Sequence, residues 1–279
     1  MTRAVGAGAL GRRLFALTMT LLAAGLGSFI LLPLLALFTH GGPLSLLRGL
    51  GHPVALPALW LSLATTVTAL VIVVIGGTPL AWHLARTSGR LSRWLETTLQ
   101  LPMVMPPSVA GIALLLAFGR QGVLGTPLHS LGWSFAFSSM AVVMAQVFVS
   151  SPFYLQAALV AFRRLDANLL AVARSFGASP ARIFFAVALP LARPALLAGA
   201  ATAWARALGE FGATLMFAGN VAGKTQTLPL AIYAALETDL RAAQTLSVLL
   251  VLIAFALLLA VRGRATVVGR SSPLEKARS

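Results

Sequence analysis

The chain has 279 residues, of which 58% are hydrophobic and 10% are charged, and its mean hydropathy is +0.91. This composition lies far from that of soluble domains and indicates an integral membrane protein. The sequence contains no cysteine, which excludes disulfides, zinc–thiolate sites, iron–sulfur clusters and cysteine nucleophiles. Its four histidines are scattered and no carboxylate cluster accompanies them, so we expect no metal, no bound cofactor and no catalytic residue.

The net charge of +15 is distributed unevenly along the chain. Most lysines and arginines fall in segments that we expect in the cytoplasm: the N-terminal lead, the turn at 86–93, the segment at 163–190 and the C-terminal tail. This asymmetry is the positive-inside rule, which reports topology rather than substrate. Since no basic stretch is interleaved with aromatic residues, we expect no nucleic-acid partner.

Two long apolar runs follow a short cytoplasmic lead at residues 1–13. Leu14–Phe38 is too long for a signal-peptide core and lacks a small-residue cleavage site, so we interpret it as an uncleaved transmembrane helix. His40–Leu56 is expected to be an outside loop, and Pro57–Leu84 the second span. Small and hydroxylated residues in the second span favour close packing against other helices.

The third apolar run, Trp94–Phe118, contains Pro102, Pro106 and Pro107. Proline removes a backbone donor and bends or breaks a helix, and irregular backbone at membrane depth is tolerated only against protein or a water-filled path. The run is therefore either a broken span beside a water-filled pathway, or an interfacial amphipathic segment followed by a span that begins near Pro106.

A polar segment at residues 163–190 separates the fourth span from the fifth. A membrane hairpin needs only a short turn, so a segment of this length should have its own function. Asp166 suits the start of a short helix and Gly177 its end, because glycine adopts the left-handed cap conformation at low cost. Ser179 followed by Pro180 is typical of the N-cap and first position of a second helix. The sequence thus predicts a helix–Gly–helix unit that presses against another protein.

The fifth span, expected at Ala195–Ala218, carries opposite charges. Arg206 and Glu210 are four residues apart, so on one helix they would meet on the same face. A lone charge in hydrocarbon costs about 2.5–3.5 kcal/mol even on insertion scales, so such residues pair or face water. Gly209 and Gly212 flank Glu210 and would permit the close approach of a second helix. These residues either line the translocation pathway near its gate or form an ion pair that only fixes helix packing.

The segment Asn220–Arg241, expected outside the membrane, begins beside a sequence that looks like a phosphate-binding loop. The pattern of Gly, four residues and Gly-Lys-Ser/Thr would end at Lys224 and Thr225, but it needs a glycine where the chain has Ala218. We therefore expect no nucleotide site in this chain.

Six spans with both termini in the cytoplasm agree with the charge distribution. The fourth and sixth are expected at Phe137–Phe162 and Ala242–Val261. The chain thus divides into the lead, a transmembrane domain at residues 14–262 and a basic cytoplasmic tail at residues 263–279.

The segment at 163–190 resembles the coupling loop of binding-protein-dependent ABC importer permeases, whose motif is Glu-Ala-Ala, three residues, Gly, nine residues and Ile-x-Leu-Pro. The glycine and the Leu-Pro fall at the right spacing, and Ala171 replaces the leading glutamate. This resemblance implies that a partner ATPase contacts a coupling loop that contains Ala171, Ala173, Ser175, Phe176, Gly177, Ala178, Pro180, Leu189 and Pro190.

The permease subunit of molybdate importers is similar to this chain in three further stretches: LPMVMPPSVAGIALLLAFG, RALGEFGATLMFAGN and TQTLPLAIY. The resemblance as a whole covers roughly residues 57–262. It implies a type I ABC importer permease in a bacterial-type inner membrane. The implied partners are a second copy of the chain, two ATPase subunits that bind ATP, and a soluble binding protein outside. Molybdate is the first substrate implied, with sulfate or tungstate as alternatives.

A secondary anion transporter without an ATPase is the competing hypothesis. Proton-coupled carriers usually need ionisable residues deep in their spans, and of the six acidic residues only Glu96 and Glu210 lie within candidate spans. Co-purification with an ATPase would separate the two classes. Since no nucleophile–base or metal constellation is present in the sequence, we expect a transport subunit and not an enzyme.

Overall fold

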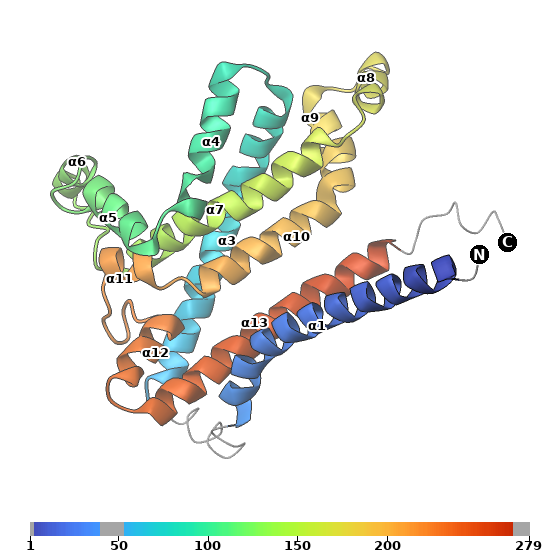
Figure 1. Cartoon of the computed structure of the whole chain (residues 1–279). Coiled ribbons are helices and arrows are strands. Elements are labelled where there is room, and N and C mark those ends of the chain that lie inside the picture. Colours follow the sequence, from blue (N-terminus) through green and yellow to red (C-terminus); the bar gives the residue numbers. More distant parts are fainter. Residues whose placement is uncertain (1–2, 40–52, 270–279) are drawn as a thin grey trace.

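The computed structural model describes residues 3–39 and 53–269, and helices dominate this part of the chain (Figure 1). Most of the expected outside loop at 40–56, and part of the lead and of the tail, lie outside the described residues. The elements are α1 (Arg3–Thr39), α3 (Ala55–Arg86), α4 (Arg90–Val104), α5 (Pro107–Phe118), α6 (Gly125–Ser130), α7 (Ser139–Arg163), α8 (Ala167–Ser175), α9 (Pro180–Ile183), the π-helix η1 (Phe184–Ala188), α10 (Leu189–Leu208), α11 (Gly212–Ala218), α12 (Leu228–Leu236) and α13 (Leu240–Gly269).

Within these ranges, five helices are long and apolar enough to cross a bilayer, and the bent pair α4–α5 makes six if it counts as one span. The expected first, second, fourth and sixth spans are confirmed at Leu14–Thr39, Ala55–Arg86, Ser139–Arg163 and Leu240–Leu257. The all-α membrane fold is therefore as the sequence predicted. Helix α13 continues to Gly269, so the boundary of the tail at residue 263 stays a prediction.

Helices α3, α7 and α10 pack together as the centre of the molecule (Figure 1). Small residues permit this: a Cβ atom at Gly77 would lie 2.9 Å from Cδ1 of Tyr154, and one at Gly199 would lie 2.6 Å from Cβ of Ala157. Tyr154 is fully buried, and its hydroxyl hydrogen-bonds to Oγ1 of Thr78 at 2.6 Å. Close backbone approach therefore holds the bundle, as is usual for helices that pack in lipid.

The third apolar run is broken, as its prolines predicted. Helix α4 ends at Val104, α5 begins at Pro107, and the two are bent by 118°. The expectation of a span that begins near Pro106 is wrong, because α5 has 12 residues and a length of about 18 Å against a hydrocarbon thickness of about 30 Å. Any crossing at this point needs both helices.

The fifth span differs from the expectation in both of its limits. We placed it at Ala195–Ala218, after a coupling segment that ends at Pro190, but Pro180–Leu208 forms one helical run through α9, η1 and α10. Inside this run the Leu189 N–H donates to the carbonyl of Phe184, five residues earlier. A bond of this spacing forms the wide turn of a π-helix. Proline lacks an N–H and crowds the carbonyl four residues earlier, so a wide turn directly before Pro190 lets the helix continue.

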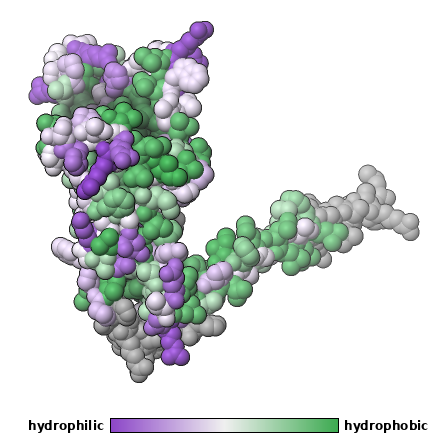
Figure 2. All heavy atoms as spheres, turned by 90° about the vertical axis from the view of Figure 1, so that its left-hand side faces the viewer, coloured by the Kyte–Doolittle hydropathy of each residue, from purple (hydrophilic) through white to green (hydrophobic). Residues whose placement is uncertain are grey.

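Helices α1 and α13 lie side by side as an arm that leaves the central bundle (Figure 1). The Gln244 side chain donates from Nε2 to the Leu37 carbonyl at 3.0 Å. None of the residues in the apolar window of α1 is buried within the chain. Figure 2 shows hydrophobic residues along most of this arm. Lipid or another protein must cover such a surface.

The segment Asn220–Arg241, expected outside the membrane, contains a helix, and its side of the membrane stays a prediction. Helix α12 lies within it and packs against α3 and α13, with Leu228 and Ala231 buried. The Leu228 N–H donates to Oγ of Ser62 at 2.6 Å, so a hydroxyl on α3 binds the first turn of α12. The connection between α5 and α7 also contains a short helix, α6.

Candidate functional site

The two short helices of the segment at 163–190 begin at the caps that the sequence predicted. The Asp166 carboxylate accepts from the Asn168 N–H at 2.8 Å and caps α8. The Ser179 hydroxyl accepts from the Arg182 N–H at 3.3 Å and caps α9, with Pro180 directly after it. Both caps satisfy backbone donors that the first turn of a helix leaves unpaired.

Gly177 ends α8 in the left-handed conformation, with φ of +77°. The Ala178 N–H donates to the Ala173 carbonyl at 3.1 Å, and the Gly177 N–H donates to the Arg174 carbonyl at 2.9 Å. This pair of bonds is the Schellman motif, which requires a positive φ at the glycine position. The predicted helix–Gly–helix geometry is confirmed.

The tip of this unit is exposed and its base is anchored. Leu170 and Ile183 are buried, whereas the Phe176 side chain is 86% exposed. The structure brings together the predicted loop residues from 171 to 180, and leaves Leu189 and Pro190 on α10. The role of all these residues as an ATPase contact stays a prediction.

An aromatic cluster lies at the base of the unit, and the sequence reasoning missed it. The Trp82 ring lies 5.3 Å from that of Phe162 and 5.3 Å from that of Phe184, measured between centroids. The Arg86 guanidinium carbon lies 4.2 Å from the Trp82 ring centroid, within the range of a cation–π interaction. These residues come from α3, α7 and η1, so the cluster fixes the segment to two transmembrane helices. The signal in the sequence was an aromatic residue near the end of the second and fourth apolar runs (Trp82 and Phe162) and another, Phe184, just before the fifth.

The predicted pair Arg206–Glu210 is present, but it does not lie on one helix. Nη1 of Arg206 is 2.7 Å from Oε2 of Glu210, and α10 ends at Leu208, between them. The other carboxylate oxygen, Oε1, accepts from the Ala213 N–H at 2.8 Å and so binds the first turn of α11. The Glu210 side chain is 1% exposed and that of Arg206 is 29% exposed. The carboxylate is buried but paired, as a charge at this depth requires.

Of the two flanking glycines, only one permits a close approach. A Cβ atom at Gly212 would lie 2.6 Å from Cβ of Pro107, at the start of α5. At Gly209 the nearest atom is the Ala205 carbonyl oxygen at 3.7 Å, which is ordinary contact. The expectation of a close approach is therefore confirmed at Gly212 and wrong at Gly209.

In the sequence that looks like a phosphate-binding loop, the Thr225 hydroxyl forms hydrogen bonds to the backbone of the same loop. Oγ1 of Thr225 accepts from the Val221 N–H at 2.9 Å and donates to the Gly219 carbonyl at 3.2 Å. Thr225 is fully buried. The side chain thus stabilises a turn, and the expectation that this is not a nucleotide site stays a prediction.

Four buried side-chain oxygens in the described part of the chain have no hydrogen-bond partner: those of Gln146, Thr214, Asn220 and Thr227. Thr214 lies on α11, shortly after residues 209–211, which connect α10 to α11 and are called the Glu210 turn below. The sequence reasoning did not single out the two threonines, because a threonine in an apolar run is also compatible with simple helix packing.

The comparisons with known proteins agree with this architecture. Residues 77–268 match the family described as binding-protein-dependent transport system inner membrane component. The chain is 47% identical over 212 residues to the molybdenum transport system permease protein ModB of Mycobacterium tuberculosis, covering 76% of this chain and 80% of that protein. It is 37% identical over 234 residues to a probable transport system permease protein, NifC, of Clostridium pasteurianum, covering 84% and 82%.

Solved structures agree with the fold. A bacterial alginate ABC transporter in complex with an alginate-pentasaccharide-bound periplasmic protein aligns with a TM-score of 0.73 at 14% identity, covering 94% of this chain and 97% of that chain. The inward-facing MetNI methionine ABC transporter aligns with a TM-score of 0.62 at 20% identity, covering 77% and 96%. The fold is thus that of a type I ABC importer permease. The chain belongs to the binding-protein-dependent transport family of inner membrane components and is a multi-pass protein of that membrane.

Proposed function

We propose that this chain is the membrane-spanning subunit of an ATP-driven importer that carries molybdate into the cytoplasm. The identity of 47% to a curated molybdenum transport permease, over 80% of the length of that protein, is the observation that carries the proposal. A relative from Escherichia coli with the same printed description, 38% identical over 182 residues, adds support. Sulfate and tungstate, which are similar oxyanions, are the alternative cargoes.

The working complex in this proposal contains two copies of the chain, two ATPase subunits and one soluble binding protein. The alginate transporter aligned above was solved with a periplasmic protein, which supports the last partner. The uncovered apolar face of α1 is consistent with a second copy. ATP binds to the ATPase partners and not to this chain, and both termini lie in the cytoplasm.

The proposed mechanism is lever-like. ATP brings the ATPase subunits together. Each of them moves a coupling unit, which is the helix–Gly–helix segment formed by α8, Gly177 and α9. Because α9, η1 and α10 form one helical run, a displacement of the unit shifts the end of α10 near Arg206. The Glu210 turn is the proposed gate, with Gly209 beside it and Gly212 against α5. Hydrolysis of ATP then resets the pathway.

Uptake of radiolabelled molybdate tests the proposal. Cells that lack their own importer would receive this chain with the ATPase and binding protein of the same organism. Uptake that tungstate competes, but excess sulfate does not, would support a molybdate and tungstate carrier. Equal competition by sulfate would move the assignment to a general sulfate-type carrier, and absence of uptake with every component present would contradict the proposal.

A further inference from the structure

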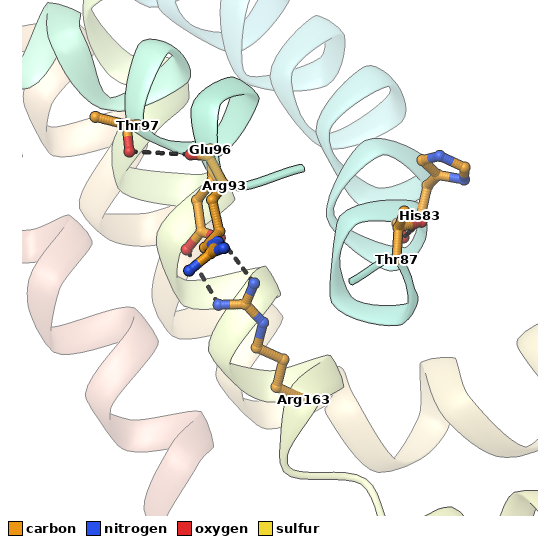
Figure 3. Close-up of polar contacts among 6 residues, drawn as sticks. All are labelled: His83, Thr87, Arg93, Glu96, Thr97 and Arg163. Carbon is orange, nitrogen blue, oxygen red and sulfur yellow. Dashed lines mark hydrogen bonds and ion pairs between the residues drawn. The ribbon is translucent and has the colours of Figure 1, made fainter. Parts of the chain in front are cut away.

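Helix α4 packs against α7, and a bidentate ion pair joins the two helices. Nη2 of Arg163 lies 2.7 Å from Oε2 of Glu96, and Nη1 lies 3.1 Å from Oε1. Figure 3 shows the Arg163 side chain reaching from the end of α7 to Glu96 on α4. Ser92 is the buried residue of α4, while Leu91 and Trp94 are exposed. A two-bond guanidinium–carboxylate contact fixes orientation as well as distance.

The pair joins two separate elements of the chain. Of the ion pairs within residues 3–39 and 53–269, it is the one that connects two long helices, since Arg206 and Glu210 are near neighbours in sequence. Arg163 is the last residue of α7, and Asp166, which caps α8, follows three residues later. The arginine therefore lies at the root of the coupling unit.

The other end of the α4–α5 element reaches the Glu210 turn. Helix α4 leads through the break at residues 105–106 into α5, whose first residue is Pro107. Pro107 is the residue that approaches Gly212 so closely that a Cβ atom there would lie 2.6 Å from its own Cβ. Gly212 is two residues from Glu210, which binds both Arg206 and the first turn of α11. A continuous chain of contacts thus runs from the root of the coupling unit to this turn.

We propose that Glu96 and Arg163 are positioning residues for transport. Their ion pair makes the α4–α5 element move with the coupling unit, so that Pro107 pushes against the Glu210 turn when the ATPases close. This inference rests on the proposed function and adds a second path to the one along α10. Neither residue needs to contact the substrate.

The partly exposed location of the pair separates this role from simple stabilisation. The Arg163 side chain is 44% exposed and that of Glu96 is 22% exposed, and ion pairs at such sites contribute little to folding stability. Loss of the pair should therefore leave the protein folded and inserted. The effect should lie in the coupling between ATP hydrolysis and uptake.

Charge reversal tests the inference in proteoliposomes that contain this chain and its ATPase, with the binding protein and molybdate added. The variants are Glu96→Arg, Arg163→Glu and the double variant that restores the pair in reverse. Arg90→Glu is the matched control, because Arg90 is exposed at the start of α4 and has no ion pair within the described residues. ATP hydrolysed per molybdate imported is the readout, and the thermal midpoint of each purified variant reports folding.

We expect each single reversal to raise the ATP consumed per molybdate about tenfold, a typical coupling factor between sites, at an unchanged thermal midpoint. The double variant should return to within about twofold of the wild type, and Arg90→Glu should match the wild type. Single variants with normal coupling, or a double variant as uncoupled as the singles, would overturn the inference. If the wild type itself shows no ATP-dependent uptake, the proposed function has failed instead.

Discussion

Glu210 bridges the end of one helix and the start of the next: Oε2 lies 2.7 Å from Nη1 of Arg206, although α10 ends at Leu208. The same carboxylate accepts from the Ala213 N–H at the first turn of α11. One buried acid therefore holds together the two sides of a break in the membrane domain. Both of its contacts are lost if the turn opens, which makes the turn a suitable gate.

The substitution Glu210→Gln separates these two contacts. The glutamine side chain keeps a neutral oxygen for the Ala213 N–H but loses the ion pair with Arg206. We expect the protein to insert normally, to lose about 1–3 kcal/mol of stability and to import molybdate more slowly, because partly buried Arg206 loses its partner. Uptake by inserted variant protein is the measurement. Normal uptake would indicate that the pair only fixes helix packing.

Gly212 and Gly209 provide a matched pair of substitutions. A methyl group at Gly212 would lie 2.6 Å from Cβ of Pro107, so Gly212→Ala should displace α5 and cost about 1–3 kcal/mol. At Gly209 the nearest atom is 3.7 Å away, so Gly209→Ala should change the thermal midpoint little. Thermal unfolding of both purified variants checks this. Equal midpoints for the two variants would contradict the assigned contact.

The local geometry of the coupling unit could be predicted because it is encoded locally. Asp166, Gly177 and Ser179 act on backbone groups within a few residues of themselves, and each has the role that the sequence predicted. The apolar spans were also predictable, since their length and composition are set by the bilayer.

The geometry around the Glu210 turn could not be predicted, because it depends on partners distant in sequence. An apolar run that reads as one helix from Ala195 to Ala218 breaks after Leu208, where Glu210 caps α11 and Pro107 packs against Gly212. The ion pair between Glu96 and Arg163 likewise joins residues 67 positions apart. Such contacts leave no periodic signal in a single sequence.

The left-handed conformation of Gly177 predicts different effects for two substitutions. No atom lies within 4 Å of a Cβ built there, so a side chain meets open space and the cost is backbone strain. Valine is strongly disfavoured at positive φ, whereas asparagine tolerates it. We expect Gly177→Val to lower uptake well below that of Gly177→Asn, with both proteins present in the membrane. Equal uptake by the two variants would show that the cap conformation does not matter for coupling.

The most direct test of the central claim uses proteoliposomes with and without the ATPase. Vesicles that contain this chain together with the ATPase receive the binding protein and labelled molybdate, and are then driven by ATP or by an imposed proton gradient. The account predicts uptake only with ATP, the ATPase and the binding protein all present. Uptake driven by the proton gradient in vesicles that lack the ATPase would contradict it and identify a secondary transporter.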